Sequence, residues 1–576
     1  MKPITICAII LSISTLFLFS CKDQAKKASF ENIKTVADLT QHSHEFTKRV
    51  EKVTDGVYVA IGYGLANSIL LEGDDGVIIV DTMESIETAT DVRNAFKQIT
   101  QKPIKAIIYT HNHADHVFGA SAFTDGRHIP VYAHITTSSY IDRLINILRP
   151  IITKRSMRMF GNFLDADGLV NAGIGPKLCI NKDSVIGVVR PTRTFEDTLT
   201  DEIAGIRFTM VHAPGETPDQ IFIWLPDKKI LLSGDNIYKT FPNLYTIRGT
   251  QYRDVTKWVQ SLDKMRALRP AYLVPSHTGP VSGSKKIYKI LTDYRDAIAY
   301  VHDQTIRGMN MGLTPDELAV TVHLPPLLAK SPYLQEFYGT VEWSVRSIFD
   351  GNLGWFDGNP TTLFPLSPLE HAKQMANLAG GETKLQNQAE TAFNDKQYQW
   401  VLELTDHLLR LNLKNKKAIN LRVKSLIALG ENQSNPNARH YYLTCAAELG
   451  QGLSIQQQGK ATSEMVHSLP MKGFFDSLAV NLDAEKSADM NLIVGFIFPD
   501  SGENYTVHVR RGVAEIQPRL MKNLDITVTV PSTIWKEMLA KLRNPITTIA
   551  TDFDIEGGKI RFLKFMALFS PEYEQS

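Results

Sequence analysis

The sequence predicts an α/β region, followed by an all-helical region and then an α+β domain. Within residues 50–280, β-branched and apolar runs are typical of buried strands, and residues 84–99 have helical spacing. Residues 283–429 carry mostly amphipathic helical patterns. From about residue 465, strand-like stretches precede a helix, an order typical of α+β domains.

The length of 576 residues suggests roughly three or four domains. We divide the chain into a signal peptide or lipobox (1–21), a polar tether (22–48), an α/β catalytic domain (49–283), a helical domain (284–435) and an α+β domain (436–576). The net charge is only +1, so no overall field favours nucleic acid or an anionic membrane. An anionic small molecule must therefore be recognised by local groups.

The N-terminus has the features of an export signal. Lys2 precedes the apolar run 9–19, which is short for a membrane span. Residues 18–21 (Leu-Phe-Ser-Cys) resemble a bacterial lipobox with an unusual phenylalanine, so Cys21 is the expected lipid-modified residue. We therefore expect a periplasmic or cell-envelope lipoprotein that meets the membrane only through this anchor. A plain cleaved signal and an uncleaved anchor are the alternatives.

Cysteine usage indicates no disulfide framework. Beyond Cys7 and Cys21, only Cys179 and Cys445 remain for the folded part, and they lie far apart in the sequence. The exported chain must then rely on packing and metal binding for its stability.

In chain order, the first elements form a series of strands. Residues 57–60 and 68–71 are strand-like, and residues 73–76 (Gly-Asp-Asp-Gly) read as a hairpin turn. The next strand, 76–82, contains Asp81 near its end, where we expect it to support the metal-binding loop from outside. A helix over 84–99 leads into a further buried strand.

A dense group of metal-ligand side chains follows the strand at residues 104–110. His111, His113, Asp115 and His116 fall within six residues, and imidazole and carboxylate groups suit zinc and similar ions. Sites in α/β folds gather at such strand ends. The alternative is a polar loop whose histidines are satisfied internally. The motif resembles the metallo-β-lactamase superfamily, which implies an αββα sandwich.

Three later strand ends supply one further ligand each under this resemblance. Glu216 occupies the turn in which the superfamily commonly has a histidine, and carboxylate oxygen can still bind zinc. Asp235 follows the strand at 230–234 and corresponds to the superfamily's bridging aspartate, and His277 follows the strand at 271–275. His212 precedes the Glu216 turn, and we expect a core or supporting role for it.

The segment 133–193 is long and weakly patterned. It is either an insertion that covers the site or a surface excursion without a role.

A narrower resemblance is to the bacterial alkylsulfatases, metallo-β-lactamase-type enzymes that hydrolyse sulfate esters of fatty alcohols. It rests on Glu216 in place of histidine and on ordered segments that extend over nearly everything after residue 50. These segments are 243–249 (Asn-Leu-Tyr-Thr-Ile-Arg-Gly), 302–305, 312–315, 324–326, 337–340 and 353–360.

The sequence departs from that family at three places. The turn 214–218 is one residue shorter, Asp235 stands where the family typically has glutamate, and Phe364 stands where it usually has histidine. We expect the first two to leave the metals in place, and Phe364 to alter the substrate pocket.

The resemblance implies two zinc ions per chain and a hydrolysis that yields an alcohol and inorganic sulfate. We assign one metal to His111, His113 and Glu216, and the other to Asp115, His116 and His277, with Asp235 shared. Asp115 and Asp235 are thus the expected catalytic carboxylates, since two cations lower the pKa of a shared water.

The same resemblance assigns sulfate binding to Asn243 and Arg248, because a guanidinium offers a planar fork of donors. Fixing the backbone of their loop is the alternative role.

The helical domain of the alkylsulfatases mediates dimer formation, so we expect a homodimer, with a simple packing module as the alternative. The C-terminal domain resembles their sterol-carrier-like domain, which is either a device for recruiting alkyl chains or purely structural.

Two other functions stay open from the sequence. One is a hydrolase of the same fold that acts on a phosphodiester, a lactone or a carboxylic ester. The other is a lipid-binding lipoprotein in which the metal site is only structural.

Overall fold

The computed structural model describes residues 28, 30, 33–456 and 458–569. The predicted signal peptide and Cys21 lie outside these residues. None of the helices in the described part of the chain combines the length and the apolar character that a membrane span requires.

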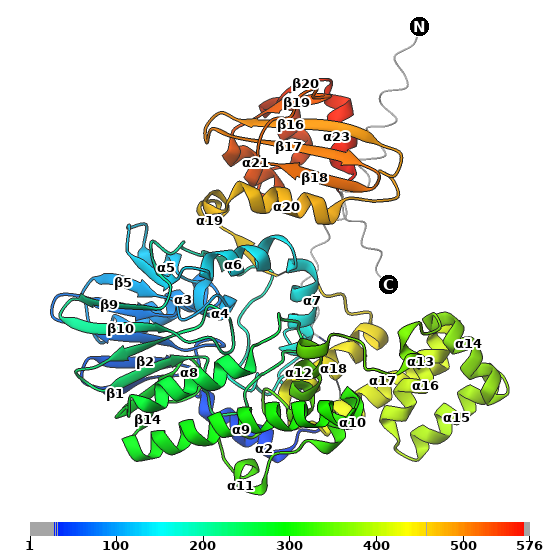
Figure 1. The fold of residues 1–576 in the computed structure, drawn as a ribbon, viewed down its shortest axis with the longest axis horizontal. Helices are drawn as coiled ribbons and strands as arrows, with labels where there is room; N and C mark the ends of the chain where they lie inside the picture. Colours follow the sequence, from blue (N-terminus) through cyan, green and yellow to red (C-terminus); the bar gives the residue numbers. More distant parts are fainter. Residues whose placement is uncertain (1–27, 29, 31–32, 457, 570–576) are drawn as a thin grey trace.

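Two sheets pack face to face at the centre of the α/β domain (Figure 1). The first has the order β1-β2-β3-β4-β5-β6-β8 and the second β14-β13-β12-β11-β10-β9. Their apolar strand faces form one core between the sheets. The strands of the first sheet are β1 (Arg49–Thr54), β2 (Val57–Ile61), β3 (Ser68–Glu72), β4 (Val77–Val80), β5 (Ile104–Ile108), β6 (Val131–His134) and β8 (Arg193–Phe195). Those of the second are β9 (Thr198–Ile203), β10 (Ile206–His212), β11 (Ile221–Leu225), β12 (Ile230–Gly234), β13 (Tyr272–Pro275) and β14 (Val281–Ser282).

Helices cover the outer faces of both sheets, so the predicted αββα sandwich is confirmed. On one side lie α3 (Ile86–Phe96), α4 (Ala114–Val117) and α5 (Ser121–Thr124). On the other, α8 (Val255–Ala267) packs against α9 (Ser284–Asn310) over β12 and β13. The helix α9 was predicted to start the helical domain, but its apolar stripe is buried against the sandwich.

The insertion forms two helices, α6 (Thr137–Asn146) and α7 (Arg149–Met159), and then a largely irregular stretch. It ends in the short strand β7 (Val185–Ile186), which pairs in parallel with β15 (Lys460–Ala461). The start of the C-terminal region is therefore fastened to the insertion.

The all-helical region is confirmed, and its helices α13–α17 form a lobe beside the sandwich (Figure 1). Its members are α10 (Pro315–Thr321), α11 (Pro326–Ala329), α12 (Val341–Leu353), α13 (Pro360–Leu363), α14 (Pro368–Ala379), α15 (Glu382–Asn394), α16 (Tyr398–Leu411), α17 (Lys416–Glu431) and α18 (Pro436–Gln451). Helix α18 continues past residue 435, the predicted end of this domain, and packs on α7.

The C-terminal domain is α+β, as predicted, and lies above α6 (Figure 1). Its sheet has the order β18-β17-β16-β19-β20. Its elements are α19 (Ser463–Ser468), α20 (Met471–Asn481), β16 (Asn491–Phe498), β17 (Glu503–Arg510), β18 (Val513–Gln517), β19 (Ile526–Thr529), α21 (Ser532–Leu539), α22 (Pro545–Asp552), β20 (Asp554–Glu556) and α23 (Lys559–Ala567). Aromatic side chains such as Phe475, Phe496 and Trp535 pack against one another in its interior.

Part of the predicted tether is folded onto the body of the protein. Residues Ala37–His42 form α2 and Ser43–Phe46 form a 3₁₀ helix, η1. Leu39 and Phe46 are buried, so the segment is attached well before residue 48.

Candidate metal centre

The predicted metal-binding loop begins directly after β5 and runs into α4. The strand is buried, and the chain leaves it at Thr110, whose backbone N–H and hydroxyl both donate to Asp81 at 2.9 Å. Asp81 comes from the neighbouring strand end and has a positive φ of 60°. The loop is therefore fixed by a carboxylate at the end of the next strand, as the sequence predicts.

The remaining predicted ligands arrive from the second sheet. Glu216 lies in the turn between β10 and β11, Asp235 follows β12, and His277 follows β13. All seven predicted ligands meet in three overlapping groups whose ligand atoms lie within 4.8 Å of one another. These groups are His111–His116–Asp235, Asp115–His116–His277 and His113–Glu216–Asp235.

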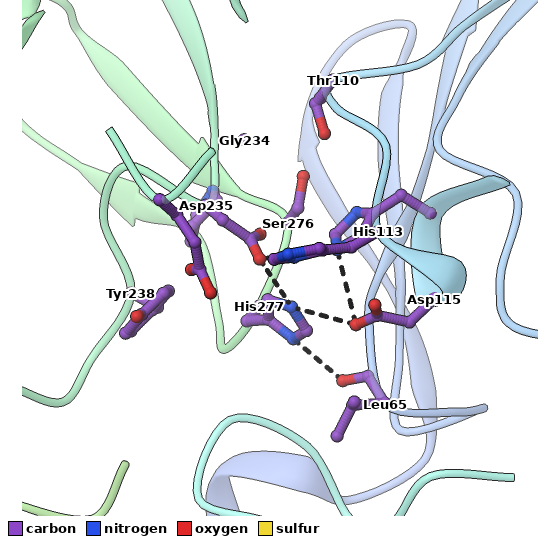
Figure 2. A network of polar contacts seen from close by, with 12 residues as sticks. Leu65, Thr110, His113, Asp115, Gly234, Asp235, Tyr238, Ser276 and His277 are labelled. Carbon is purple, nitrogen blue, oxygen red and sulfur yellow. Dashed lines mark hydrogen bonds and ion pairs between the residues drawn. The ribbon is translucent and has the colours of Figure 1, made fainter. Parts of the chain in front are cut away.

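The second group reproduces the ligand set predicted for one metal. His277 Nε2 lies 3.4 Å from Asp115 Oδ2 and 3.2 Å from Asp235 Oδ2 (Figure 2). His116 Nε2 lies 3.4 Å from each of the same two oxygens. Asp235 is thus shared between the groups, the position expected of a bridging carboxylate.

The other predicted metal draws on the remaining two groups. His111 Nε2 and His113 Nδ1 lie 2.9 Å apart and face the same space. His111 Nε2 is 3.7 Å from Asp235 Oδ2, and Glu216 joins His113 at this end.

The outward nitrogens of the histidines are held by the surrounding protein. His116 Nδ1 lies 2.9 Å from Asp81 Oδ2, His277 Nδ1 donates to the carbonyl of Leu65 at 2.9 Å (Figure 2), and His111 Nδ1 lies 3.0 Å from the Thr110 hydroxyl. Such bonds fix the tautomer that turns a lone pair toward a metal.

Four of the inward atoms, in contrast, have no hydrogen-bond partner among the described residues. These buried atoms are His116 Nε2, His277 Nε2, Glu216 Oε2 and Asp235 Oδ1. Buried polar atoms are normally satisfied, and four convergent exceptions need a ligand. Nitrogen and carboxylate donors in this number fit two divalent cations of the zinc type.

Electrostatics place some of the ligands, but not all, in the protonation state that binds metal. Burial, together with neighbouring His116, lowers the pKa of His111 well below its ordinary value, and burial does the same for His113. Although burial opposes ionisation, His116 and His277 lower the pKa of Asp115 to about 2. At His116 and His277, burial is outweighed by the carboxylates of Asp115 and Asp235, which raise the pKa of both histidines above the ordinary histidine value, and burial raises the pKa of Glu216. Neutral imidazoles and ionised carboxylates are the forms that coordinate cations.

Of the two predicted sulfate-binding residues, Arg248 lies beside the cluster, and Asn243 is connected to it through Arg253. Arg248 Nη2 is 3.1 Å from His113 Nε2. Asn243 is fully buried, and neither its amide nitrogen nor its amide oxygen has a partner. The Asn243 side chain therefore has unused hydrogen-bonding capacity among the described residues.

Arg253 was missed by the sequence reasoning. It is 2 % exposed, and its Nη1 lies 2.9 Å from Glu216 Oε1. The same nitrogen donates to the backbone carbonyl of Asn243. The only signal in the sequence is one arginine between Tyr252 and Asp254, and no periodicity or motif marks it.

Glu84 was also missed. It is buried and accepts from the backbone N–H groups of Leu65 and Cys179 at 3.0 Å and 2.8 Å. Burial raises its pKa to about 7. Since the carbonyl of Leu65 holds His277, Glu84 supports that ligand through the backbone.

His212 lies outside the three groups. It stacks on His134 with ring centroids 3.9 Å apart, and its Nε2 lies 2.8 Å from the carbonyl of Pro218. It braces the Glu216 turn from behind, which fits the expected supporting role.

A deep cavity opens from the ligand cluster. Its volume, including the open mouth, is about 1030 Å³. At one end lie His113, Asp115, Asp235 and Arg248. The rest is predominantly apolar and is lined by α6 and α7 of the insertion and by Ala461 and Met465 of the C-terminal region, as in Leu144, Ile145, Ile152 and Met157. The insertion therefore covers the site, as the first of its two interpretations predicts, and is not a surface segment without a role.

The expected effect of Phe364 on this cavity is not met within one chain. Phe364 is 91 % exposed and does not line the cavity. It sits at the end of α13, in the lobe beside the sandwich.

Three family models match successive parts of the chain. Residues 61–277 match the metallo-beta-lactamase superfamily, residues 314–452 match alkyl sulfatase dimerisation, and residues 459–574 match the alkyl sulfatase C-terminal domain.

Individual proteins match over nearly the whole length. A linear primary-alkylsulfatase of Pseudomonas sp. is 37% identical over 522 residues, which is 87% of this chain and 98% of that protein. An alkyl/aryl-sulfatase of Saccharomyces cerevisiae is 28% identical over 91% of this chain and 83% of its own. The solved structure of a stereoselective inverting sec-alkylsulfatase from Pseudomonas sp. has a TM-score of 0.86 at 26% identity, covering 94% of this chain and 88% of that one.

Proposed function

The chain belongs to the alkylsulfatase family of the metallo-β-lactamase superfamily, and from this premise we infer that it hydrolyses alkyl sulfate esters to an alcohol and inorganic sulfate. The observation that carries the inference is the cavity, which has proposed metal ligands and Arg248 at one end and predominantly apolar walls over the rest. An alkyl sulfate has the matching division between an anionic head and a hydrocarbon chain. Predominantly apolar walls with a few placed polar groups are the usual design of a small-molecule site.

We propose that Arg248 and Asn243 hold the sulfate group. Arg248 supplies a charged fork of donors at the polar end of the cavity. Asn243 does not line the cavity in the described part of the chain, but its buried amide is a neutral donor without a partner there, and its carbonyl accepts from Arg253 beside Glu216. Placing the sulfate at the polar end brings its ester oxygen next to Asp115 and Asp235, which share the cavity wall. The alkyl chain then extends between α6 and α7.

The seven ligands are proposed to hold two zinc ions. His111, His113 and Glu216 would hold one, Asp115, His116 and His277 the other, and Asp235 would be shared. When bound, such cations supply a water of lowered pKa that can attack near neutral pH. The protein's part is to keep His111 and His113 neutral through burial, to orient His116 and His277 through Asp81 and Leu65, and to exclude bulk water with the insertion.

Substrate class is tested by comparing esters on the purified, zinc-loaded chain. Sulfate release from dodecyl sulfate is the expected activity, and turnover of dodecyl acetate, a long-chain lactone and bis(p-nitrophenyl) phosphate should be at least about 100-fold lower in kcat/KM. A preference for any of the other esters would overturn the sulfatase assignment. Binding of dodecanol without turnover of any ester would favour a lipid-binding protein.

We propose that the chain forms a homodimer through the lobe that matches the dimerisation model. Between α12 and α14, large apolar side chains lie exposed, an arrangement that marks association surfaces. This apolar surface consists of Leu353, Trp355, Leu363, Phe364, Leu366 and Leu369.

Light scattering after size exclusion tests the dimer. The wild type should have twice the chain mass, and the double variant Trp355→Ser with Phe364→Ser should be monomeric at micromolar concentration. Val480→Ser, at an exposed valine of the C-terminal domain, should stay dimeric. A monomeric wild type would contradict the proposal.

We also propose export as a lipoprotein anchored at Cys21, supported by the N-terminal sequence alone. Labelling with a radioactive fatty acid in a bacterial host should mark the wild type and leave Cys21→Ser unlabelled. Equal labelling of both, or of neither, would overturn the anchor.

A further inference from the structure

A buried ion pair adjoins the metal centre. Arg253 and Glu216 have side chains only 1 % exposed each, and Arg253 Nη1 lies 2.9 Å from Glu216 Oε1. The other oxygen, Glu216 Oε2, is buried without a partner and joins the group with His113 and Asp235. The arginine thus holds one oxygen of the carboxylate while the other is turned to the site.

The glutamate adds a charge that a histidine would not. Asp115, Glu216 and Asp235 give the proposed ligand set three carboxylates, and all three are buried. A buried charge without a partner is strongly destabilising, and a carboxylate that can rotate is a poor ligand. Arg253 is the cation that forms an ion pair with Glu216.

The arginine also connects this ligand to the proposed sulfate site. Its Nη1 donates to the carbonyl of Asn243, in the segment that leads to Arg248. Arg253 lies just before α8, whose first turn is capped by Asp254. The backbone that carries the guanidinium therefore adjoins the start of a regular helix, and the guanidinium itself is held through Nη1.

We propose that Arg253 is a positioning residue for Glu216. It fixes Oε1 of the carboxylate and so presents Oε2 to the metal. It also supplies the counter-charge that a glutamate ligand requires at a position where the superfamily commonly has a neutral histidine. The proposal rests on the metal-ligand role of Glu216 proposed above. It makes one specific claim, that Arg253 is needed because residue 216 is a carboxylate.

The experiment is a double-mutant cycle on the full chain, with zinc affinity measured by competition against a chelator. The variants are Arg253→Met, Glu216→His and the two combined. Arg253→Met alone should weaken one of the two zinc ions by about 10- to 100-fold, as loss of a group that orients a ligand does. With histidine at residue 216, the same replacement should change the affinity by less than about threefold. An equal loss in both backgrounds, or no loss in either, would overturn the proposal.

Two further variants distinguish a failure of the role proposed for Arg253 from a failure of the ligand role proposed for Glu216. Arg253→Lys keeps the charge and should retain most of the affinity; a loss as large as that of Arg253→Met would contradict the counter-charge. Glu216→Gln should itself weaken zinc binding, and if it binds as the wild type does, the ligand role of Glu216 fails rather than the role of Arg253. If Arg253→Met folds only with histidine at residue 216, by circular dichroism, the proposal is supported, and failure to fold in both backgrounds would contradict it.

Discussion

The two ends of the cavity differ in how their side chains are satisfied. At the polar end, ligand atoms such as His116 Nε2 and Glu216 Oε2 converge without partners, while Asp81 and Leu65 hold the opposite sides of the histidines. At the apolar end, side chains such as Ile152 and Met465 close the wall by packing alone. The polar end therefore depends on fixed positions of its side chains, and the apolar end depends on the shape of its wall. Substitutions at the polar end should reduce metal binding or sulfate binding, whereas those at the apolar end should reduce binding of the alkyl chain.

The largest effect is expected at the polar end, from His116→Ala. His116 belongs to two of the three ligand groups, so its loss should lower kcat/KM for dodecyl sulfate by roughly three orders of magnitude or more. Steady-state sulfate release and bound zinc per chain measure the effect. His128→Ala, at an exposed histidine of the same domain, is the control and should behave as the wild type. Retained activity in His116→Ala would show that the metal centre does not take part in the reaction.

Arg248→Ala should follow, with a loss of about 100-fold in kcat/KM, because one charged donor to the sulfate is removed. The zinc content should stay unchanged, which separates this effect from that of His116→Ala. Arg248→Lys keeps the charge but not the planar fork, and we expect it to recover only part of the activity. Loss of zinc in Arg248→Ala would mean that the arginine supports the ligands instead of the substrate.

Much of the polar end could be predicted from the sequence, because each ligand follows an apolar run that marks a buried strand. The loop at His111–His116 and the strand ends at Asp235 and His277 carry this signal directly. Arg253 could not be found in this way, since a single buried arginine leaves no periodic pattern. Its role depends on a contact with Glu216, 37 positions away in the chain.

The apolar end was largely invisible to the sequence. Its walls come from α6, α7 and the segment around Met465, which are brought together by β7 and β15, strands of two residues each. Two-residue strands are too short to show the alternation of apolar and polar residues that indicates a strand in a sequence. The expectation for Phe364 is not met within one chain for a related reason: a family motif places a residue in the sequence, while only the fold shows that this residue does not line the cavity of its own subunit.

A bulky substitution sharpens the comparison at the apolar end. Ile152→Trp should lower kcat/KM for dodecyl sulfate about tenfold, since lost burial of two methylenes costs roughly 1.6 kcal/mol, and should leave butyl sulfate within about twofold. Ile151→Trp is the matched control, because Ile151 is the preceding residue of α7, is 50 % exposed and does not line the cavity. Equal losses for both esters in Ile152→Trp would show that the wall does not contact the alkyl chain.

The smallest predicted effect concerns stability and pH at Glu84, which supports the polar end from behind. Because burial raises its folded-state pKa from 4.5 to about 7, the stabilisation of the fold by the neutral carboxyl is fully present below about pH 4.5 and is lost as the pH rises through about 7. The loss is at most roughly 3 kcal/mol.

Urea unfolding of the zinc-free chain between pH 4 and 8 measures this difference. The unfolding free energy of the wild type relative to Glu84→Gln should fall across that range, while Glu382→Gln, at an exposed glutamate, should follow the wild type. A difference between wild type and Glu84→Gln that does not vary with pH would contradict the assignment.

The most direct test of the account is to remove the metal and return it. A chelator-treated chain is titrated with zinc while bound metal and sulfate release from dodecyl sulfate are followed together. We predict no sulfate release from the metal-free chain and full activity at two zinc ions per chain. Full sulfate release from the metal-free chain, or saturation of binding at two zinc ions with no activity on any alkyl sulfate, would contradict the account.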